Sequence, residues 1–305
     1  MKTNSYALAA ISAFVIWGFI AFPLKTLSPY PSSQILFYRI LLALVCLPLL
    51  LIAFRKRAMI DACQLYKTSS RKQRMSSLVA IVLSSFLLTA NWLLFIYVVN
   101  HVSLQTASFA YLLCPILTAF LAFIILKEQL KSQQWMAVGI SLLSCCMLGI
   151  DSLGNMAYSL LIALSYALYL VAQRFIKGYD KMVVLTLQVL LSFILIYCMG
   201  ENFRGTAPVA LRFYVIIFVL STIFTILPLF LNLFALKELK SATVGILMYI
   251  NPMVSFMVAF LYFNEQASIL QLLAYLLIFL SVILFTSKID FLRKKNIPGR
   301  HSVRM

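Results

Sequence analysis

Two prolines lie within long apolar stretches of the chain, in the segments LLCPI and YINPM. Proline lacks a backbone N–H and displaces the carbonyl four residues earlier, so Pro115 frees the carbonyl of Tyr111 and Pro252 that of Met248. Asn251, directly before Pro252, adds an amide that can both donate and accept hydrogen bonds. A proline in a membrane helix is often only a kink, because neighbouring helices satisfy the freed groups. We favour the alternative that both segments line a site for a small polar molecule.

Arg39 lies inside the apolar segment 34–54 and is the only charge placed well within such a segment. An arginine in the hydrocarbon layer costs several kcal/mol unless it pairs, reaches the interface or meets water. Two interpretations stay open: the side chain extends outward to the membrane surface, or it faces the interior and meets a carboxylate of a bound molecule. The second predicts that Arg39→Ala abolishes function while surface expression stays intact.

Other polar and aromatic side chains fall at similar depth. Trp17, Asn91 and Cys114 each lie about eight residues, or 12 Å, from the expected outer face. An intramembrane amide also holds helices together, and tyrosines also pack or form interfacial belts. With these alternatives open, the candidate residues are Trp17, Arg39, Asn91, Trp92, Tyr111, Cys114, Pro115, Tyr166, Tyr169, Tyr249, Asn251 and Pro252.

The composition determines which elements position these residues. Of 305 residues, 63% are hydrophobic and 11% are charged, whereas soluble domains have about 45–50% and 25%. The chain is therefore expected to be an all-α integral membrane protein. The excess of 25 lysines and arginines over 8 acids indicates cytoplasmic loops that meet anionic lipid, not nucleic acid. Neither a metal site, a cofactor nor a hydrolytic motif is indicated, so we do not expect an enzyme.

Ten segments are apolar over a length that can cross a membrane. They are residues 5–25, 34–54, 76–99, 106–126, 133–149, 155–176, 183–199, 210–235, 242–262 and 269–286. Most loop cations fall on one side, which the positive-inside rule makes cytoplasmic together with both termini. On that side, residues 55–74 are expected to form a solvated loop that sets the topology, with a basic helix on the lipid headgroups as the alternative.

An internal repeat divides the ten segments into two halves. Pro115 aligns with Pro252 and Glu128 with Glu265 at the same shift of 137 residues. Five segments per half place the second half upside down, as in transporters whose substrate site lies between inverted halves. The two glutamates then fall at opposite faces, where helix capping and ion pairing are favoured over ion coupling. The expected units are a first five-helix repeat at 1–150, a second at 151–288 and a basic cytoplasmic tail at 289–305.

The ordered set of segments resembles the EamA family of the drug/metabolite transporter superfamily, and within it the RarD-like branch. The resemblance rests on WGFIAFPLK, FYRILLALV, NWLLFIYVVNH, YLLCPILTAFLAFIILKEQL and YINPMVSFMVAFLYFNEQ. It covers essentially the whole chain and implies two inverted five-helix halves that export amino acids or related metabolites, here across a bacterial cytoplasmic membrane. One position departs: RarD-like proteins favour asparagine where this chain has Cys114, which puts any site made of two paired amides in doubt.

The expected function is secondary transport, with export by alternating access. All eight acids lie in loops or at segment ends, so neutral, zwitterionic or anionic substrates are expected. The alternatives are a receptor or scaffold that transports nothing, and a nucleotide-sugar or drug carrier of the same superfamily. The expected partners are the small-molecule substrate and membrane lipid, with the chain acting as a monomer or weak homodimer.

Overall fold

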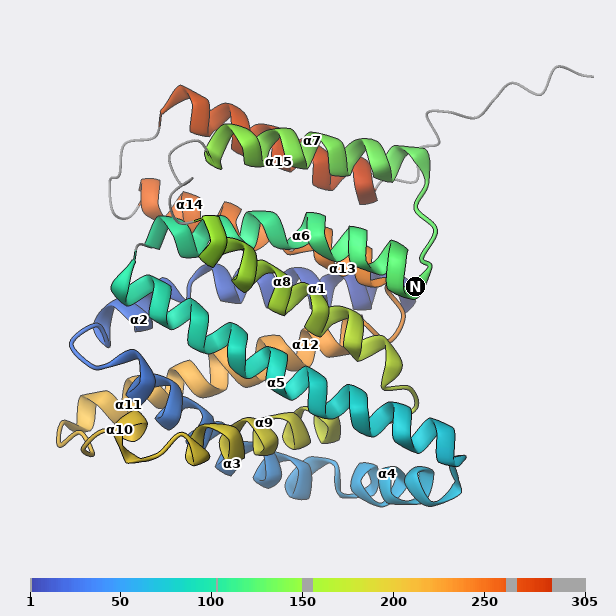
Figure 1. Ribbon diagram of the computed structural model, residues 1–305, viewed down its shortest axis with the longest axis vertical. Coiled ribbons are helices and arrows are strands. Elements are labelled where there is room, and N and C mark those ends of the chain that lie inside the picture. The colour runs from blue at the N-terminus through green and yellow to red at the C-terminus, as the bar shows by residue number, and fades with distance from the viewer. Residues whose placement is uncertain (1, 103, 150–155, 262–267, 287–305) are drawn as a thin grey trace, which may run out of the picture.

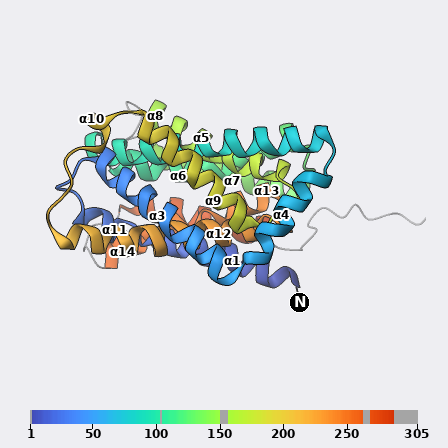
Figure 2. The ribbon, with the colours of Figure 1, turned by 90° about the horizontal axis from the view of Figure 1, so that it is seen from below.

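The computed structural model describes residues 2–102, 104–149, 156–261 and 268–286, and within these ranges it contains helices and no strands. The helices form one bundle whose long members run along a shared direction (Figure 1). α4 and the N-terminus lie at one end of the bundle, and α10 and α11 lie at the other, in both Figure 1 and Figure 2. The first end carries most of the loop cations, so we call it the cation-rich end.

The helices lie within a few residues of the predicted segments. In the first half they are α1 (Lys2–Gly18), α2 (Ala21–Thr26), α3 (Ser32–Phe54), α4 (Lys56–Thr68), α5 (Arg71–His101), α6 (Leu104–Leu126) and α7 (Ser132–Gly149). In the second half they are α8 (Met156–Ala172), the short 3₁₀ helix η2 (Gln173–Phe175), α9 (Lys181–Cys198), α10 (Glu201–Arg204), α11 (Leu211–Ser221), the π-helical turn η3 (Thr222–Ile226), α12 (Leu227–Ala235), α13 (Ser241–Leu247), α14 (Ile250–Leu261) and α15 (Ile269–Thr286).

Nine segments of the described residues are long and apolar enough to cross a membrane. They correspond to nine of the ten predicted segments, and α7 is the one that is missing. α7 spans 18 residues, but it begins with the polar run Ser132, Gln133 and Gln134, which lowers its mean hydropathy. Large apolar side chains such as those of Leu49, Phe86 and Phe279 are exposed around the bundle, as expected for a surface that faces lipid chains.

The expectation of a loop at residues 55–74 is wrong in its local structure, because Lys56–Thr68 forms the helix α4, which has no buried residue. The reason is an apolar stripe at helical spacing: Ala58, Ala62 and Leu65 are the partly buried positions of α4. Gly178 fixes this contact, since its φ of 83° suits glycine and a Cβ there would lie 2.9 Å from Leu65 Cδ2. α4 therefore packs against the loop that precedes α9.

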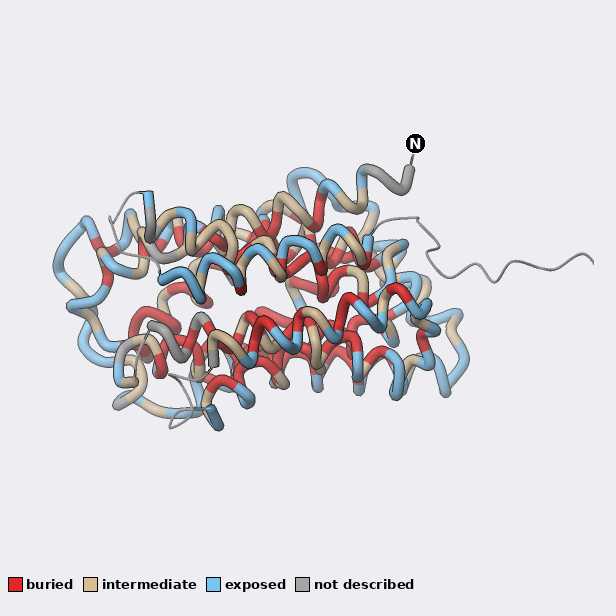
Figure 3. Tube along the Cα trace, turned by 90° about the horizontal axis from the view of Figure 1, so that it is seen from above, coloured by how far each residue is buried: buried red, intermediate tan, exposed pale blue. Residues whose placement is uncertain are grey.

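The buried residues lie on the helix sides that face one another, as Figure 3 shows. The larger buried cluster joins α1, α3, α5, α6, α8, α9, α12 and α13. A smaller one joins α6, α7, α13 and α15, and α7 and α15 lie side by side at the edge of the bundle (Figure 1). Elements far apart in sequence thus share one interior, which allows residues of both halves to form a common site.

Candidate functional site

Three of the spans are interrupted, and the interruptions contact one another. α1 gives way to α2 after Gly18, α13 gives way to α14 after Leu247, and η3 separates α11 from α12. α1 contacts α12, α14 and η3. Backbone inside a membrane leaves regular α-helical geometry only where it is buried in protein or lines a cavity, and π turns are frequent at functional sites. We therefore build the candidate site from these three interruptions.

Each interruption has a proline four residues after the affected carbonyl. Pro23 frees the carbonyl of Phe19, which accepts from Phe22 N at 3.2 Å instead. Pro252 frees the carbonyl of Met248 in the same way, and Asn251 N donates to it at 3.0 Å. Pro252 was among the predicted site residues and Pro23 was not, although the same rule applies to both prolines.

Pro228 explains the third interruption and supplies a bond to the site. It lies at the start of α12, so it leaves the carbonyl of Phe224, four residues earlier, without its helical donor. The indole Nε1 of Trp17 donates to this carbonyl at 2.9 Å. A freed backbone group of the second half is thus bound by a side chain of the first half, and Trp17 is held at the interruption.

Gly18 lets the interruption between α1 and α2 approach the interruption between α13 and α14 closely. A Cβ on Gly18 would lie 2.5 Å from Val254 Cβ and 3.2 Å from the carbonyl oxygen of Asn251. Ser255 Oγ donates to the Gly18 carbonyl at 3.1 Å, and lies 3.4 Å from Asn251 Oδ1. The buried Asn251 therefore lies at the contact between α1 and α14, where only a glycine fits opposite it.

Arg39 faces the interior and does not extend outward to the surface. Its side chain is 4% exposed, its Nε donates to Thr225 Oγ1 at 2.6 Å, and its guanidinium carbon lies 4.9 Å from the centre of the Trp92 ring. Ser221 Oγ donates to the Arg39 carbonyl at 3.0 Å. No carboxylate of the described residues pairs with the guanidinium, and none of them accepts a bond from its terminal nitrogens. The buried cation therefore has free donors.

Aromatic side chains of α8 complete the arrangement. The Tyr166 ring meets the Trp17 ring edge-on at 6.1 Å, and its hydroxyl accepts from Asn232 Nδ2 at 2.7 Å. Asn232 Oδ1 and the Tyr169 hydroxyl, both buried, have no partner among the described residues. Asn232 was not among the predicted site residues, although its amide lies within the apolar run FLNLFA and could have indicated it. The central polar cluster is defined as Trp17, Arg39, Trp92, Tyr166, Thr225 and Asn232.

Two further candidates have structural partners. Asn91 Nδ2 donates to the Ile162 carbonyl at 2.9 Å and to Ser165 Oγ at 3.1 Å, so this amide joins α5 to α8. Cys114 is fully buried, with its sulfur 3.8 Å from Thr118 Oγ1. Cys114 belongs to the same buried cluster as Trp17, Trp92 and Tyr166, and the Ser165 that Asn91 contacts directly precedes Tyr166 in the chain.

Tyr111 and Tyr249 lie on different sides of the interior. The Tyr111 ring lies 5.2 Å from that of Phe95 and packs against the larger buried cluster. Tyr249 belongs to the smaller cluster, with α7 and α15. The candidate residues therefore do not all converge on one point.

The prolines that align in the repeat differ in effect. Pro115 lies within the uninterrupted helix α6, whereas Pro252 follows the interruption between α13 and α14. Pro115 therefore leaves its helix continuous, although both prolines were expected to free a backbone carbonyl. The helices α6 and α13 are nevertheless in close contact, because a Cβ on Gly245 of α13 would lie 2.8 Å from Thr118 Cβ of α6.

Glu128 joins the two halves at the cation-rich end. Its carboxylate accepts from Ser241 N at 3.1 Å and Ala242 N at 3.3 Å, and so caps the start of α13. Arg174 Nε lies 3.8 Å from the same carboxylate. We call these contacts the Glu128 tie. Glu265, its partner in the repeat, lies outside the described residues.

Further bonds between described residues cross between the halves at this end. Lys240 Nζ donates to the Gln129 carbonyl at 3.0 Å, and Arg55 pairs with Asp180 at 2.9 Å. Among the described residues, no group of three or more His, Cys, Asp or Glu side chains could hold a metal ion. The Glu128 tie and these bonds join the first half of the chain to the second at the cation-rich end.

Comparison with known proteins gives one family and several relatives. The sequence profile of the EamA-like transporter family matches residues 4–150 and again residues 154–287. "Uncharacterized transporter YojE" of Bacillus subtilis is 26% identical over 292 residues, covering 93% of this chain and 94% of its own. "Protein RarD" of Salmonella typhimurium is 26% identical over 304 residues, covering 96% of this chain and 98% of its own. "Protein RarD" of Escherichia coli is 24% identical over 293 residues, covering 93% and 94%.

A solved protein structure has the same fold. It superposes with a TM-score of 0.73 at 14% sequence identity, and the match covers 93% of this chain and 96% of the other.

Proposed function

The chain belongs to the EamA-like transporter family and is an integral membrane transporter, and we propose that it exports small metabolites that carry a carboxylate. Amino acids and related zwitterionic or anionic compounds are the substrate class. The family and the transporter names of the relatives support a role without catalysis.

The observation that carries the substrate class is the state of Arg39. A buried guanidinium has five donors arranged in a planar fork that matches a carboxylate. In this chain one donor is used by Thr225, and the Trp92 ring lies close to the guanidinium. A buried cation without a charged partner is costly and marks a functional site in membrane proteins. A substrate carboxylate that takes the free donors would supply the missing partner, with Trp17 and Tyr166 beside it.

We further propose ten spans in two inverted halves, with both termini cytoplasmic. Two observations support this. The family profile matches once in each half. In addition, a contact between two helices recurs between the two helices that hold the same positions in the opposite halves. The contact of α1 with α12 corresponds to that of α8 with α5, and α1 with α14 corresponds to α8 with α6. α3 with α9, α6 with α13 and α7 with α15 each pair equivalent helices, as a pseudo-two-fold axis requires.

The transport mechanism that we propose is alternating access, with the cation-rich end closed in this structure. The Glu128 tie, the Lys240–Gln129 bond and the Arg55–Asp180 pair each join the first half to the second at that end. Opening toward the cytoplasm would require the halves to separate there. The same proposal places the chain in a bacterial cytoplasmic membrane, as a monomer or weak homodimer with anionic lipid at its basic loops.

The proposed function is tested by counterflow in proteoliposomes. Wild-type protein, Arg39→Ala and Arg212→Ala are reconstituted at equal density and tested against a panel of amino acids and other small carboxylates. We expect flux of at least one carboxylate in wild type and in the Arg212→Ala control, and none in Arg39→Ala. Full flux in Arg39→Ala would refute the role of Arg39, and absence of flux for every compound in wild type would favour a receptor or scaffold.

A further inference from the structure

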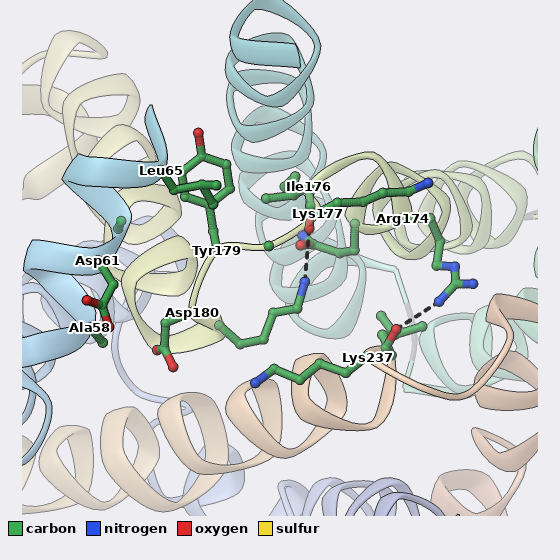
Figure 4. Close-up of a pocket in the computed structure, with 14 residues that line it drawn as sticks. Ala58, Asp61, Leu65, Arg174, Ile176, Lys177, Tyr179, Asp180 and Lys237 are labelled. Atoms are coloured by element: carbon green, nitrogen blue, oxygen red, sulfur yellow. Dashed lines mark hydrogen bonds between the residues drawn. The ribbon is translucent and has the colours of Figure 1, made fainter. Parts of the chain in front are cut away.

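A second pocket lies at the cation-rich end of the bundle. It has a volume of about 710 Å³ and lies between α4, the segment from η2 to the start of α9, and the turn after α12 (Figure 4). None of the residues of the central polar cluster lines it. Pockets that hold small ligands commonly have volumes of about 300–1,000 Å³, so the size suits a metabolite or a lipid headgroup.

The charges around this pocket are unbalanced. Its lining includes Lys177, Lys181 and Lys237, with Asp61 as an exposed carboxylate. In Figure 4, Asp61 lies on the opposite side of the pocket from Lys177. Three lysines against one aspartate leave a net charge of +2. A phosphate monoester carries about −1.5 to −2 at neutral pH, so its charge is the complement of that of the pocket.

The other charged residues of the lining already have partners. Asp180 pairs with Arg55 at 2.9 Å and accepts from Met182 N at the start of α9. Arg174 donates to the Leu236 carbonyl at 2.9 Å and lies beside Glu128. These residues hold the walls of the pocket together. The three lysines make no ion pair with a carboxylate of the described residues, although Lys237 Nζ lies 5.7 Å from the centre of the Phe234 ring.

Two buried polar groups lack the partners that their burial requires. Gln173 is 2% exposed, and both atoms of its amide have no hydrogen-bond partner among the described residues. Lys181 is 7% exposed, and its ammonium donates to the Ile176 carbonyl at 3.2 Å. No carboxylate of the described residues forms an ion pair with it. Unpaired buried polar groups are costly, so each one calls for an explanation such as a missing ligand.

We infer that this pocket binds a phosphate group, with Lys177, Lys181 and Lys237 supplying charge and the Gln173 amide donating a hydrogen bond. Lysine ammonium groups bind phosphate as compact point charges. The phosphate comes either from a soluble phosphorylated metabolite or from an anionic lipid headgroup. The inference does not depend on the transported substrate, because it rests on a different set of residues.

The test uses the full-length protein with two ligand sources. In an uncharged detergent at constant ionic strength, thermal unfolding is followed against glycerol 3-phosphate, with glycerol as the uncharged control. In nanodiscs of phosphatidylcholine with or without phosphatidic acid, native mass spectrometry counts the bound lipid. A response in the first arm identifies a soluble ligand and a response in the second a lipid headgroup, and either supports the inference.

The variants are chosen so that folding is preserved. Lys177→Ser and Lys237→Ser change exposed side chains of the pocket. Lys67→Ser is the matched control, because Lys67 is an exposed lysine on α4 that does not line the pocket. We expect the half-saturating ligand concentration to rise about tenfold in each pocket variant, the effect of losing one charged hydrogen bond, and to stay unchanged in Lys67→Ser. The inference is overturned if neither ligand binds wild type, or if Lys67→Ser weakens binding as much as Lys177→Ser.

Discussion

The Glu128 tie gives the sharpest prediction about conformational change. Glu128→Ala removes both acceptors for Ser241 N and Ala242 N, which lie 3.1 and 3.3 Å from the carboxylate. Hydrogen bonds to a charged group contribute about 1.5 kcal/mol or more each, so the two together stabilise the closed end by about 3 kcal/mol. The contact with the partly exposed Arg174 adds less than about 1 kcal/mol.

The free energy of these two hydrogen bonds sets the fraction of molecules whose cation-rich end is open. If these bonds form only when the cation-rich end is closed, a loss of about 3 kcal/mol raises the open fraction about 100-fold while it remains a minority. Val244, fully buried on α13 and one turn from Ser241, is a suitable reporter position. The Val244→Cys variant, with the six native cysteines replaced, is alkylated by a water-soluble maleimide in inverted vesicles.

We expect Glu128→Ala to accelerate alkylation of this cysteine by up to about 100-fold. Glu128→Gln should give a smaller increase, because the amide keeps an acceptor oxygen but loses the charge. Glu238→Ala is the matched control, since Glu238 is an exposed glutamate at the same end. Equal alkylation rates for Glu128→Ala and Glu238→Ala would refute the role of the tie.

Two other predictions follow from the contacts of the site. Gly18→Ala places a Cβ 2.5 Å from Val254 Cβ, so it should lower the unfolding temperature and the transport rate. Gly139→Ala is the control and should change neither, because nothing lies within 4 Å of the added carbon. Equal effects of the two substitutions would contradict the close packing of α1 and α14. Tyr166→Phe leaves Asn232 Nδ2 without its acceptor at 2.7 Å and should lower the free energy of unfolding by about 1–3 kcal/mol. Adding Asn232→Leu should recover part of this loss. Strictly additive effects of the two substitutions in this double-mutant cycle would rule out an interaction between Tyr166 and Asn232.

Much of the fold could be predicted because hydrocarbon thickness and backbone hydrogen bonding restrict spans to long apolar helices. α4 could not be assigned with the same certainty, because its apolar stripe of Ala58, Ala62 and Leu65 stabilises a helix only when the loop near Gly178 packs against it. The interruption at Pro23 was predictable in principle and was missed, because a proline in a membrane helix often leaves the helix intact, as Pro115 does.

The candidate site was predictable as a set of residue types and less so as a geometry. The cost of an unpaired intramembrane cation singled out Arg39, but its direction depended on Thr225 in a helix 186 residues away. Tyr249 was expected at the site as one of the polar and aromatic side chains at similar depth, yet the turn between α13 and α14 directs it into the smaller cluster with α15. Side-chain direction at an interruption follows from the local backbone path, which the hydrophobic pattern does not contain.

Substrate selectivity tests whether Arg39 binds the carboxylate of the substrate. For a carboxylate identified by counterflow, the flux is compared with that of its carboxamide analogue, in wild type and in Arg39→Gln. We predict a strong preference for the carboxylate in wild type, and a preference reduced at least about tenfold in Arg39→Gln. The same preference in both proteins would contradict the claim.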